Sequence, residues 1–548
     1  MMQINIEKQS PAILEKTADG FFADFALAAF GRLAYEIEAD EPCKVEMAIG
    51  EVLAAPGKIE REPGGYRCIK IAEVELEKGV NRGFMFIKKH RSPYQDDYQR
   101  SKVLTPENAG GEIAPFRYAE VNGPVKSVKL TRHALFAPFD EDSAHFSCAD
   151  ERLNKVWEFC KYSMKATSCF GIYVDGDRER QAFEGDCYIN ALGAYCTGGG
   201  YEVARRTLDF MISFYPIPAM EYRLFTPILV RDYFLYSGDT DIYRYWKSDM
   251  PEKFMPGYMS EDGLYHYPEQ FEAMHPALKE MKRYYQYFEM FPDNSQLLID
   301  WPWEERDGYE FNELNLVPHA FLYGAYQAMN DLEPGCGYDA KAAKLQGDIM
   351  RLFRRADGRY CDNSVSEHMA VHSAMFAVAW GAADKKDYPF LADFMQKKGM
   401  ACSVYGAQFL LDACFMTGAA QHAIELMRAD NDRSWLGMMR QGSTISMEAW
   451  NNAAKPNQDW NHAWGAAPAN IIPRRLAGIR PIANGLKKFV FDPQPGDIAE
   501  FYMKHPTPQG SVIAEYSNGK AQLTVPEGTE ALCGGKSYAA GKHTIALK

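Results

Sequence analysis

The sequence lacks the features that mark membrane-spanning, zinc-binding and disulfide-bonded proteins. No apolar run reaches about 18 residues, the length that a membrane-spanning helix needs. The twelve cysteines include no CxxC pair, which favours reduced thiols over a metal cluster or a disulfide framework. The N-terminal segment MMQINIEKQSPAIL has no basic stretch followed by an apolar one, so no secretory signal is visible. We therefore expect a cytoplasmic protein without membrane contact, and leave open a leader removed ahead of this sequence.

Positive charge is scarce as well. The chain has 60 Lys and Arg against 74 Asp and Glu, a formal net charge of −14 and a pI near 5.5. Nucleic-acid binding needs clustered basic residues, so this balance argues against a nucleic-acid partner. It also disfavours a polyanionic ligand, although a local basic pocket could override the overall field. Aromatic residues, in contrast, make up 13% of the chain, and their faces suit stacking on sugar rings.

The length of 548 residues is enough for about two to four domains, and the chain divides into three by pattern. Residues 1–145 contain short alternating runs such as 45–49, 66–71 and 125–130, separated by turn clusters, which predict an N-terminal β-sandwich. The apolar stretch 21–33 fits either a helix or a buried strand, because periodicity alone does not separate the two.

Residues 146–480 have the pattern of a helical domain. Ser147-Cys148-Ala149-Asp150 resembles a capping box, and apolar residues at helical spacing follow it. About ten to twelve helices fit an (α/α)6 barrel of paired helices better than a four-helix bundle. After Pro481 the alternating pattern returns, which predicts a small C-terminal β-sandwich over 481–548. The clearest helical stretches are 187–195, 201–214, 224–236, 316–329, 340–353, 368–380, 405–415 and 419–427.

The densest charged segment is YVDGDRERQAFEGD at 173–186, where five carboxylates and two arginines lie within twelve residues. A solvated loop with ion pairs is the structural explanation of such a segment. The functional explanation is a catalytic acid whose pKa is raised by neighbouring negative charge, as proton donation near neutral pH requires.

Two further segments carry candidate chemistry. Glu448 is the only acid between Asp432 and Asp459, among small, apolar and aromatic residues, and could be a base or a structural group. His462 could orient Glu448 or bind a sugar, although a lone histidine is more often structural. The segment DWPWEE at 300–305 combines carboxylates and tryptophans, the groups that bind sugar hydroxyls and ring faces.

Together and in this order, these segments resemble the bacterial α-L-rhamnosidase family of inverting glycosidases. YVDGDRERQAFEGD is similar to that family's YxDCPxRERxxxxGD, and IDW at 299–301 to its GDW. SWLGMMRQGSTISMEAW is similar to PSWGYMxxxGATTxWERW, and NHAWGAAPANIIPRRLAGIRP to NHYAFGxVxEWLYRxxAGIxP. The resemblance covers about residues 145–500.

The resemblance implies a hydrolase that acts on rhamnosylated glycans or glycosides. It places Glu179 at the general-acid position and Glu448 at the general-base position of a single-displacement reaction. No clear calcium loop appears in the sequence, so we expect catalysis without a cofactor or a metal ion. The residues that the resemblance implies in sugar binding are Asp175, Arg178, Asp186, Asp300, Trp301, Trp303, Trp450 and His462.

The chain departs from the family pattern at several positions. DGDRER has one residue fewer between the first aspartate and the glutamate than DCPxRER. Glu184 adds a carboxylate, and Met447 replaces an aromatic residue before the base, so the sugar could differ from rhamnose. The alternatives are another (α/α)6 carbohydrate enzyme, such as a glycuronyl hydrolase or a lyase, and a non-catalytic carbohydrate-binding protein. A homodimer is left open.

Overall fold

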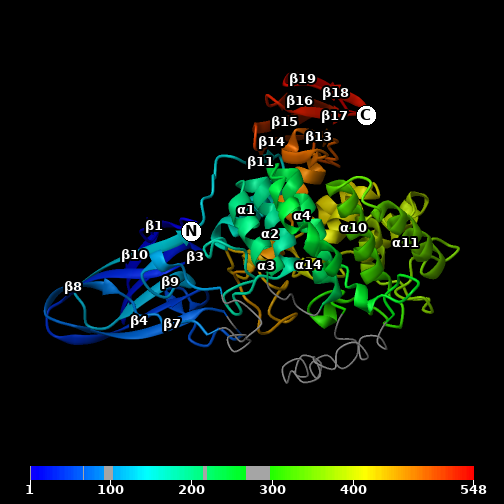
Figure 1. Cartoon of the computed structure of the whole chain (residues 1–548). Helices are drawn as coiled ribbons and strands as arrows, with labels where there is room; N and C mark the ends of the chain where they lie inside the picture. Colours follow the sequence, from blue (N-terminus) through cyan, green and yellow to red (C-terminus); the bar gives the residue numbers. More distant parts are fainter. Residues whose placement is uncertain (1, 66, 92–102, 214–218, 267–296, 548) are drawn as a thin grey trace.

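A computed structural model describes residues 2–65, 67–91, 103–213, 219–266 and 297–547. The described chain forms an antiparallel β region at the N-terminus, a central helical region, and further sheets at the C-terminus, which stand on one side of the helices (Figure 1). Of the predicted runs, Tyr66 and Phe214 lie outside the described residues.

The N-terminal region is built on one long strand, β3 (Gly20–Ala39). Its early part pairs with β2, its later part with β8, and β9 and β10 lie along its two edges, all antiparallel. The stretch 21–33 is therefore strand and not helix, because its backbone groups are used in pairing with neighbouring strands. The other strands of this eight-stranded sheet are β1 (Asn5–Gln9), β2 (Ile13–Lys16), β4 (Cys43–Gly50), β7 (Ile69–Leu76), β8 (Gly79–Phe84), β9 (Ala114–Asn122) and β10 (Ser127–Phe136), and β5 (Leu53–Ala55) pairs with β6 (Lys58–Ile59) in a separate ribbon.

The helical region begins at α1 (Glu151–Ala166). Its N-cap is Asp150, whose side chain accepts from the Arg152 N–H at 2.9 Å, and not Ser147, which belongs to a strand. The expected capping box is thus wrong by three residues, although the helix follows as predicted. The further helices are α2 (Glu184–Thr197), α3 (Tyr201–Ser213), α4 (Met220–Ser237), α5 (Asp241–Trp246), α6 (Met250–Lys253), α10 (Leu316–Leu332), α11 (Tyr338–Leu352), α12 (Val371–Ala379), α13 (Tyr388–Lys398), α14 (Val404–Met416), α15 (Ala420–Met427), α16 (Trp435–Arg440) and α17 (Pro468–Ile471), and each of the eight helical stretches predicted above overlaps one of them.

Six of the described helices pack in a closed ring. In order around it, α2 contacts α4, α4 contacts α10, α10 contacts α12, α12 contacts α14, α14 contacts α17, and α17 returns to α2. Aromatic side chains from these helices meet in the middle, with ring centroids 4.8 to 5.7 Å apart for neighbours such as Phe376–Phe409 and Tyr188–Trp380. We call this group the aromatic plug; its members are Tyr188, Phe225, Phe321, Phe376, Trp380 and Phe409, all buried.

The C-terminal sheets contain one strand from before the helices. Strand β11 (His145–Cys148) pairs antiparallel with β14 (Glu500–Thr507), so the chain passes through this sheet on its way into α1. As the alternating pattern after Pro481 predicts, this region is built of strands. The remaining strands are β15 (Gly510–Ser517), β16 (Lys520–Val525) and β19 (Gly541–Ala546) in the same sheet, and β12 (Ile479–Pro481), β13 (Lys488–Phe491), β17 (Glu530–Cys533) and β18 (Lys536–Tyr538) in a second one.

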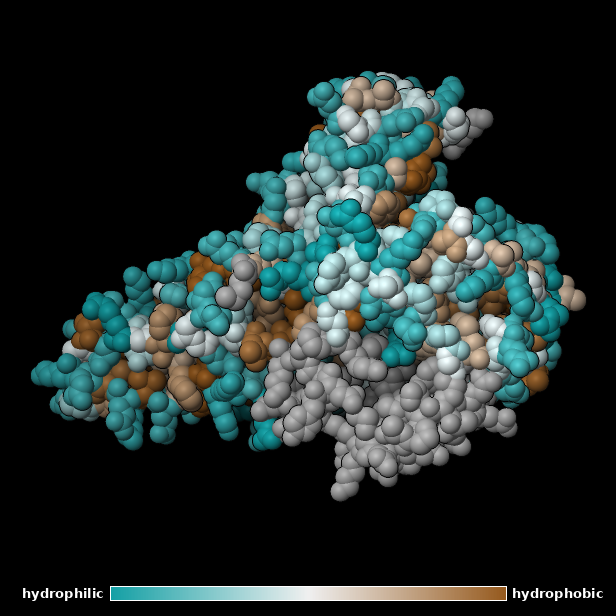
Figure 2. Space-filling view, viewed as in Figure 1, coloured by the Kyte–Doolittle hydropathy of each residue, from teal (hydrophilic) through white to brown (hydrophobic). Residues whose placement is uncertain are grey.

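The surface carries mainly hydrophilic residues over all three regions on the face drawn in Figure 2, with hydrophobic residues in small groups. Within the described ranges, none of the helices combines the length and the apolar character needed to cross a bilayer. All twelve cysteines are free thiols, as the sequence predicts.

Candidate active site

The acid-rich segment forms a loop between α1 and α2. Within it, the Asp175 N–H donates to the Gln181 carbonyl at 2.9 Å, and the Arg180 N–H donates to the Gly176 carbonyl at 3.1 Å. The Arg180 side chain anchors this turn by ion pairs with Asp177 at 2.7 Å and with Glu112 of the N-terminal region at 2.9 Å. The anchored turn leaves the two residues between Asp177 and Arg180 facing the segment that contains Glu448.

Arg178 joins the two carboxylates that the sequence singles out. Its Nη2 lies 2.7 Å from Oε1 of Glu448 and 3.0 Å from Oε1 of Glu179, and its Nη1 donates to Oε2 of Glu448 at 3.1 Å. Because both contacts end on one nitrogen atom, the nearest oxygens of Glu179 and Glu448 lie within two hydrogen-bond lengths of each other. Glu448 is almost fully buried, whereas the Glu179 side chain keeps 15% of its surface exposed and can be reached.

The surroundings shift the pKa values of the two acids in opposite directions. Burial raises the pKa of Glu179 above its ordinary value, and the negative charge of Glu448 adds to this rise against the opposing effect of Arg178. Burial also acts to raise the pKa of Glu448, but Arg178, His462 and Lys455 outweigh it, so the net shift is downward. A protonated Glu179 beside an ionised Glu448 is the pattern of an acid and a base with separate tasks.

Asp459 belongs to the same cluster, and the sequence did not single it out. Its N–H donates to Oε2 of Glu448 at 3.0 Å, and the Glu448 N–H donates back to the Asp459 carbonyl at 3.1 Å. Its Oδ2 accepts from the Arg178 N–H at 3.1 Å, while its buried Oδ1 has no partner among the described residues. Burial, reinforced by Glu448, raises the pKa of Asp459 well above its usual range. The only sign of its role in the sequence is its position in the segment DWNH at 459–462, next to His462. The spacing of residues does not show that this segment folds back onto Glu448.

His462 and Asp186 form a buried pair behind the base. Nε2 of His462 lies 2.7 Å from Oδ1 of Asp186, which sits in the first turn of α2. The neighbouring Trp464 donates from Nε1 to the Glu448 carbonyl at 3.0 Å, which fixes the backbone of the base. Asp175 is also buried, and Glu179 and Asp186 add to the effect of burial in raising its pKa well above normal.

The tryptophans of the predicted segment 300–305 lie on another side of the carboxylate cluster. The Trp301 ring is 5.9 Å from Nζ of Lys455, the residue whose Nζ is 3.2 Å from Glu448. Trp303 packs edge-on against Trp301, with centroids 5.2 Å apart. Both indoles are partly exposed, so they are placed to meet a ligand that reaches Glu448.

Two predicted sugar-binding residues have other partners in the structure. Asp300 is fully buried and accepts from the Ser403 N–H at 2.9 Å, with His372 at 2.7 Å. Trp450 is fully buried and donates to the Cys402 carbonyl at 2.8 Å. Their positions favour a structural role, in which both side chains hold the backbone beside the site. The sugar contacts predicted for Asp300 and Trp450 stay predictions.

The N-terminal region reaches into the site from β4. Glu51, directly after that strand, accepts from Nδ2 of Asn461 at 3.2 Å and from the Cys68 N–H at 2.7 Å. Oδ1 of Asn461 in turn accepts from the Asp177 N–H at 2.8 Å. Burial raises the pKa of Glu51 to about 7. One buried glutamate thus ties the N-terminal sheet to the loop of Asn461 and, through Asn461, to the acid-bearing loop.

Among the described residues, one group could hold a metal ion: Glu448, Asp459 and His462, whose possible ligand atoms lie within 4.8 Å of one another. Arg178 and Lys455 already contact the Glu448 carboxylate. A divalent cation would have to displace these two positive charges, so the donor set fits a metal poorly. The expectation of a metal-free site stays a prediction.

The family comparison gives the class of protein. Residues 141–476 match the bacterial alpha-L-rhamnosidase 6 hairpin glycosidase domain, and residues 478–534 match the bacterial alpha-L-rhamnosidase C-terminal domain. The first match alone covers more than half of the 548 residues. This chain belongs to the bacterial α-L-rhamnosidase family.

Solved structures support the fold. The chain is similar to the GH78 family rhamnosidase of Bacillus sp. GL1 (18% identity, TM-score 0.68), to the α-L-rhamnosidase of Aspergillus terreus (15%, 0.76), and to that of Streptomyces avermitilis solved with L-rhamnose (14%, 0.73). These matches cover 97%, 100% and 97% of this chain but 56%, 64% and 50% of the other chains. The chain therefore spans about half to two thirds of their length. No curated protein sequence matches it.

Proposed function

We propose that this chain is a glycosidase that hydrolyses terminal α-L-rhamnosyl linkages, or linkages of a closely related sugar, with inversion. The observation that carries the hydrolase proposal is the pair Glu179 and Glu448, held on one guanidinium and shifted in opposite directions in pKa. The shared guanidinium keeps their nearest oxygens closer together than the about 6.5–9.5 Å that leaves room for the attacking water of an inverting enzyme. Inversion is therefore proposed from the family and not from this spacing. Membership of the α-L-rhamnosidase family supports the choice of sugar.

In the proposed reaction, Glu179 donates its proton to the glycosidic oxygen as the bond to the anomeric carbon breaks. Glu448 takes a proton from a water molecule that attacks that carbon from the opposite face. The products are a free sugar of inverted configuration and an alcohol. Asp459 and the Asp186–His462 pair hold Glu448 in place. Trp301 and Trp303 stack on the sugar or on the leaving group.

We also propose that the closed ring of helices is the core of an (α/α)6 barrel over 146–480, between an N-terminal β-sandwich over 1–145 and a C-terminal one over 481–548. The contact of α17 with α2, which closes the ring, supports the barrel. The two carboxylate loops would then lie at one mouth of it, since Asp186 and Ser403 mark the N-terminal ends of α2 and α14.

The configuration of the first product tests the mechanism. With an aryl α-L-rhamnoside as substrate, we expect NMR to show β-L-rhamnose first, before it equilibrates in water. Appearance of α-L-rhamnose first would mean a retaining reaction, in which the second carboxylate is a nucleophile. An unsaturated sugar ring in the product would mean a lyase instead.

The dependence of activity on pH tests the two assignments. We expect a bell-shaped profile of kcat/KM, because activity needs ionised Glu448 and protonated Glu179. The acid limb should lie below the ordinary pKa of a glutamate and the alkaline limb above it, following the directions of the two shifts. An alkaline limb that persists unchanged after Glu179→Gln would show that another group is the acid.

A further inference from the structure

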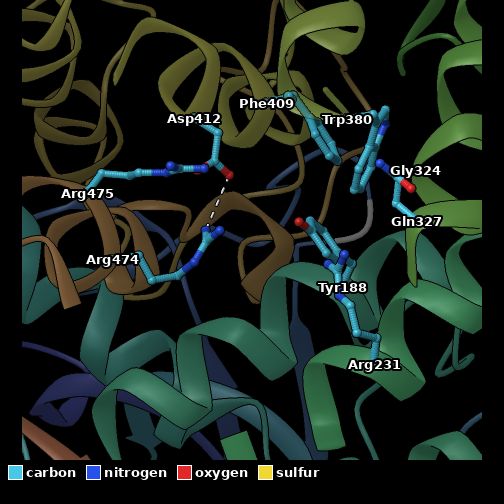
Figure 3. Close-up of a pocket in the computed structure, with 10 residues that line it drawn as sticks. Tyr188, Arg231, Gly324, Gln327, Trp380, Phe409, Asp412, Arg474 and Arg475 are labelled. Carbon is cyan, nitrogen blue, oxygen red and sulfur yellow. Dashed lines mark hydrogen bonds and ion pairs between the residues drawn. The ribbon is translucent and has the colours of Figure 1, made fainter. Parts of the chain in front are cut away.

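A separate cavity of about 150 Å³ lies among the helices of the ring (Figure 3). Polar and charged groups supply most of its wall, with three aromatic rings along one part. In Figure 3 the Tyr188 hydroxyl points toward the middle of the group, and Asp412 faces Arg474 and Arg475. The lining residues that matter here are Tyr188, Arg231, Gln327, Asp412, Arg474 and Arg475.

The cavity lies at the other end of the helices from the two carboxylates. Helix α14 begins beside Cys402 and Ser403, which hold Trp450 and Asp300 of the candidate site. Asp412 comes about two turns later, about 12 Å along the axis at the rise of an α-helix. Tyr188, Trp380 and Phe409 of the aromatic plug form its wall, so the plug separates the cavity from the carboxylates.

The lining carries more positive than negative charge. Arg474 and Arg475, consecutive residues in the π-helical turn Ile472–Leu476, share one carboxylate, Asp412, at 3.3 and 2.5 Å. Although burial acts to raise it, the two guanidiniums bring the pKa of Asp412 down to about 2, so this carboxylate stays ionised. The third guanidinium, Arg231, pairs with Asp232 at 2.7 Å and with Asp331 at 3.7 Å, both outside the lining, so its charge is balanced there.

Several donors of these guanidiniums remain unused. Arg475 bonds to Asp412 through Nε alone, and Arg474 uses Nη1 for Asp412 and Asn470. Among the residues that the structure describes, Nη1 and Nη2 of Arg475 and Nη2 of Arg474 have no acceptor. None of the three guanidiniums donates to a described backbone carbonyl, so they do not serve as caps for the helix ends nearby. Partly buried guanidiniums with spare donors favour an oxygen-rich anion, which accepts two parallel hydrogen bonds.

We propose that this cavity binds a small oxyanion, a phosphate or carboxylate group, between Arg474 and Arg475, with the Tyr188 hydroxyl as a further contact. The size restricts the ligand: a cavity of this volume holds a molecule of about the size of benzene. A whole pyranose, with about twice as many non-hydrogen atoms, does not fit. The site is therefore not a second sugar subsite, and it is independent of the proposed reaction.

Titration of the whole chain with inorganic phosphate tests this, with acetate in a parallel series and chloride at matched ionic strength as reference. We expect the Tm to rise and saturate with at least one of the two oxyanions, because a ligand that binds only the folded state stabilises it. The stronger of the two series identifies the chemical class. No rise beyond that with chloride would overturn the proposal.

Variants locate the binding. Arg475→Gln should weaken the Kd about tenfold or more through loss of a charge-assisted pair of hydrogen bonds. The matched control is Arg117→Gln, which also removes a partly buried arginine paired with an aspartate, Asp24 at 2.9 Å, but in the N-terminal sheet and outside the lining. If Arg475→Gln fails to fold, Gln327→Met replaces it. Equal weakening in the lining variant and in Arg117→Gln would overturn the site, while rhamnoside turnover should be unchanged in all of them.

Discussion

Replacement of Glu179 by glutamine is expected to lower kcat/KM for a rhamnoside of an alkyl alcohol by about 10²–10⁴-fold, the usual contribution of a general acid. The loss should be much smaller for an aryl rhamnoside with an acidic phenol, because such a leaving group departs without a proton. Glutamine keeps the size of the side chain and a hydrogen bond acceptor for Arg178, so folding should be preserved. Steady-state kinetics on the two substrates, with circular dichroism for folding, measures both effects.

The matched variant is Glu448→Gln, which should lower kcat/KM for both substrates alike, since a water molecule has to be activated whatever the leaving group. Glu158→Gln, at an exposed position of α1, is the control for loss of a carboxylate and should leave both values unchanged. If Glu179→Gln and Glu448→Gln show the same dependence on leaving group, the two roles are wrongly divided.

Arg178→Gln is expected to have the largest effect on stability. Arg178 is the closest cation to a carboxylate that is almost fully buried, and removal of one partner of such a pair costs about 3–5 kcal/mol of the free energy of unfolding. The pKa of Glu448 should rise, because Arg178 is the main group that lowers it. The acid limb of the pH–activity profile should therefore move to higher pH. Urea unfolding and kcat/KM across pH measure the two changes.

Two comparisons separate this from a general loss of charge. Arg82→Gln breaks an ion pair of the same length, 2.7 Å, but with Arg82 69% exposed, and should cost at most about 1 kcal/mol. The stability difference between Arg178→Gln and the parent chain should shrink as the pH falls below the ordinary pKa of glutamate, because protonated Glu448 no longer needs a cation. A difference that is constant across this range would mean that Arg178 acts by packing alone.

Much of the fold follows from sequence because local pattern and tertiary environment agree there. Helical periodicity located α2, α4, α10 and α14, whose apolar faces meet in the aromatic plug. It could not decide the stretch 21–33, because a strand buried on both faces and a buried helix are both continuously apolar. The capping-box motif placed the start of the helix at Ser147, because both Ser147 and Asp150 are residue types that cap helices. Only the pairing of Ser147 with a neighbouring strand excludes it as the cap.

The site was predictable to the extent that motifs carry it. Glu179 and Glu448 stand out as acids in unusual surroundings, and the resemblance to a family gave their order. Asp459 did not stand out, because its role depends on a fold-back of the chain that spacing does not encode. Asp300 and Trp450 show the opposite case: their residue types suit sugars, but burial gives each a protein partner. The type of a residue predicts what its side chain can bind, but it does not predict whether the side chain faces a cavity or another part of the protein.

The contacts of Glu51 and Glu112 with the site loops bear on how this chain can be rearranged or shortened. A fragment that starts at α1 would keep the ring of helices but lose the acceptors for Asn461 and Arg180, two residues that shape the acid-bearing turn. Exchange of the N-terminal region between related chains would likewise fail unless both loops were exchanged with it. The N-terminal sheet and the two site loops therefore form one structural unit, although they lie far apart in the sequence.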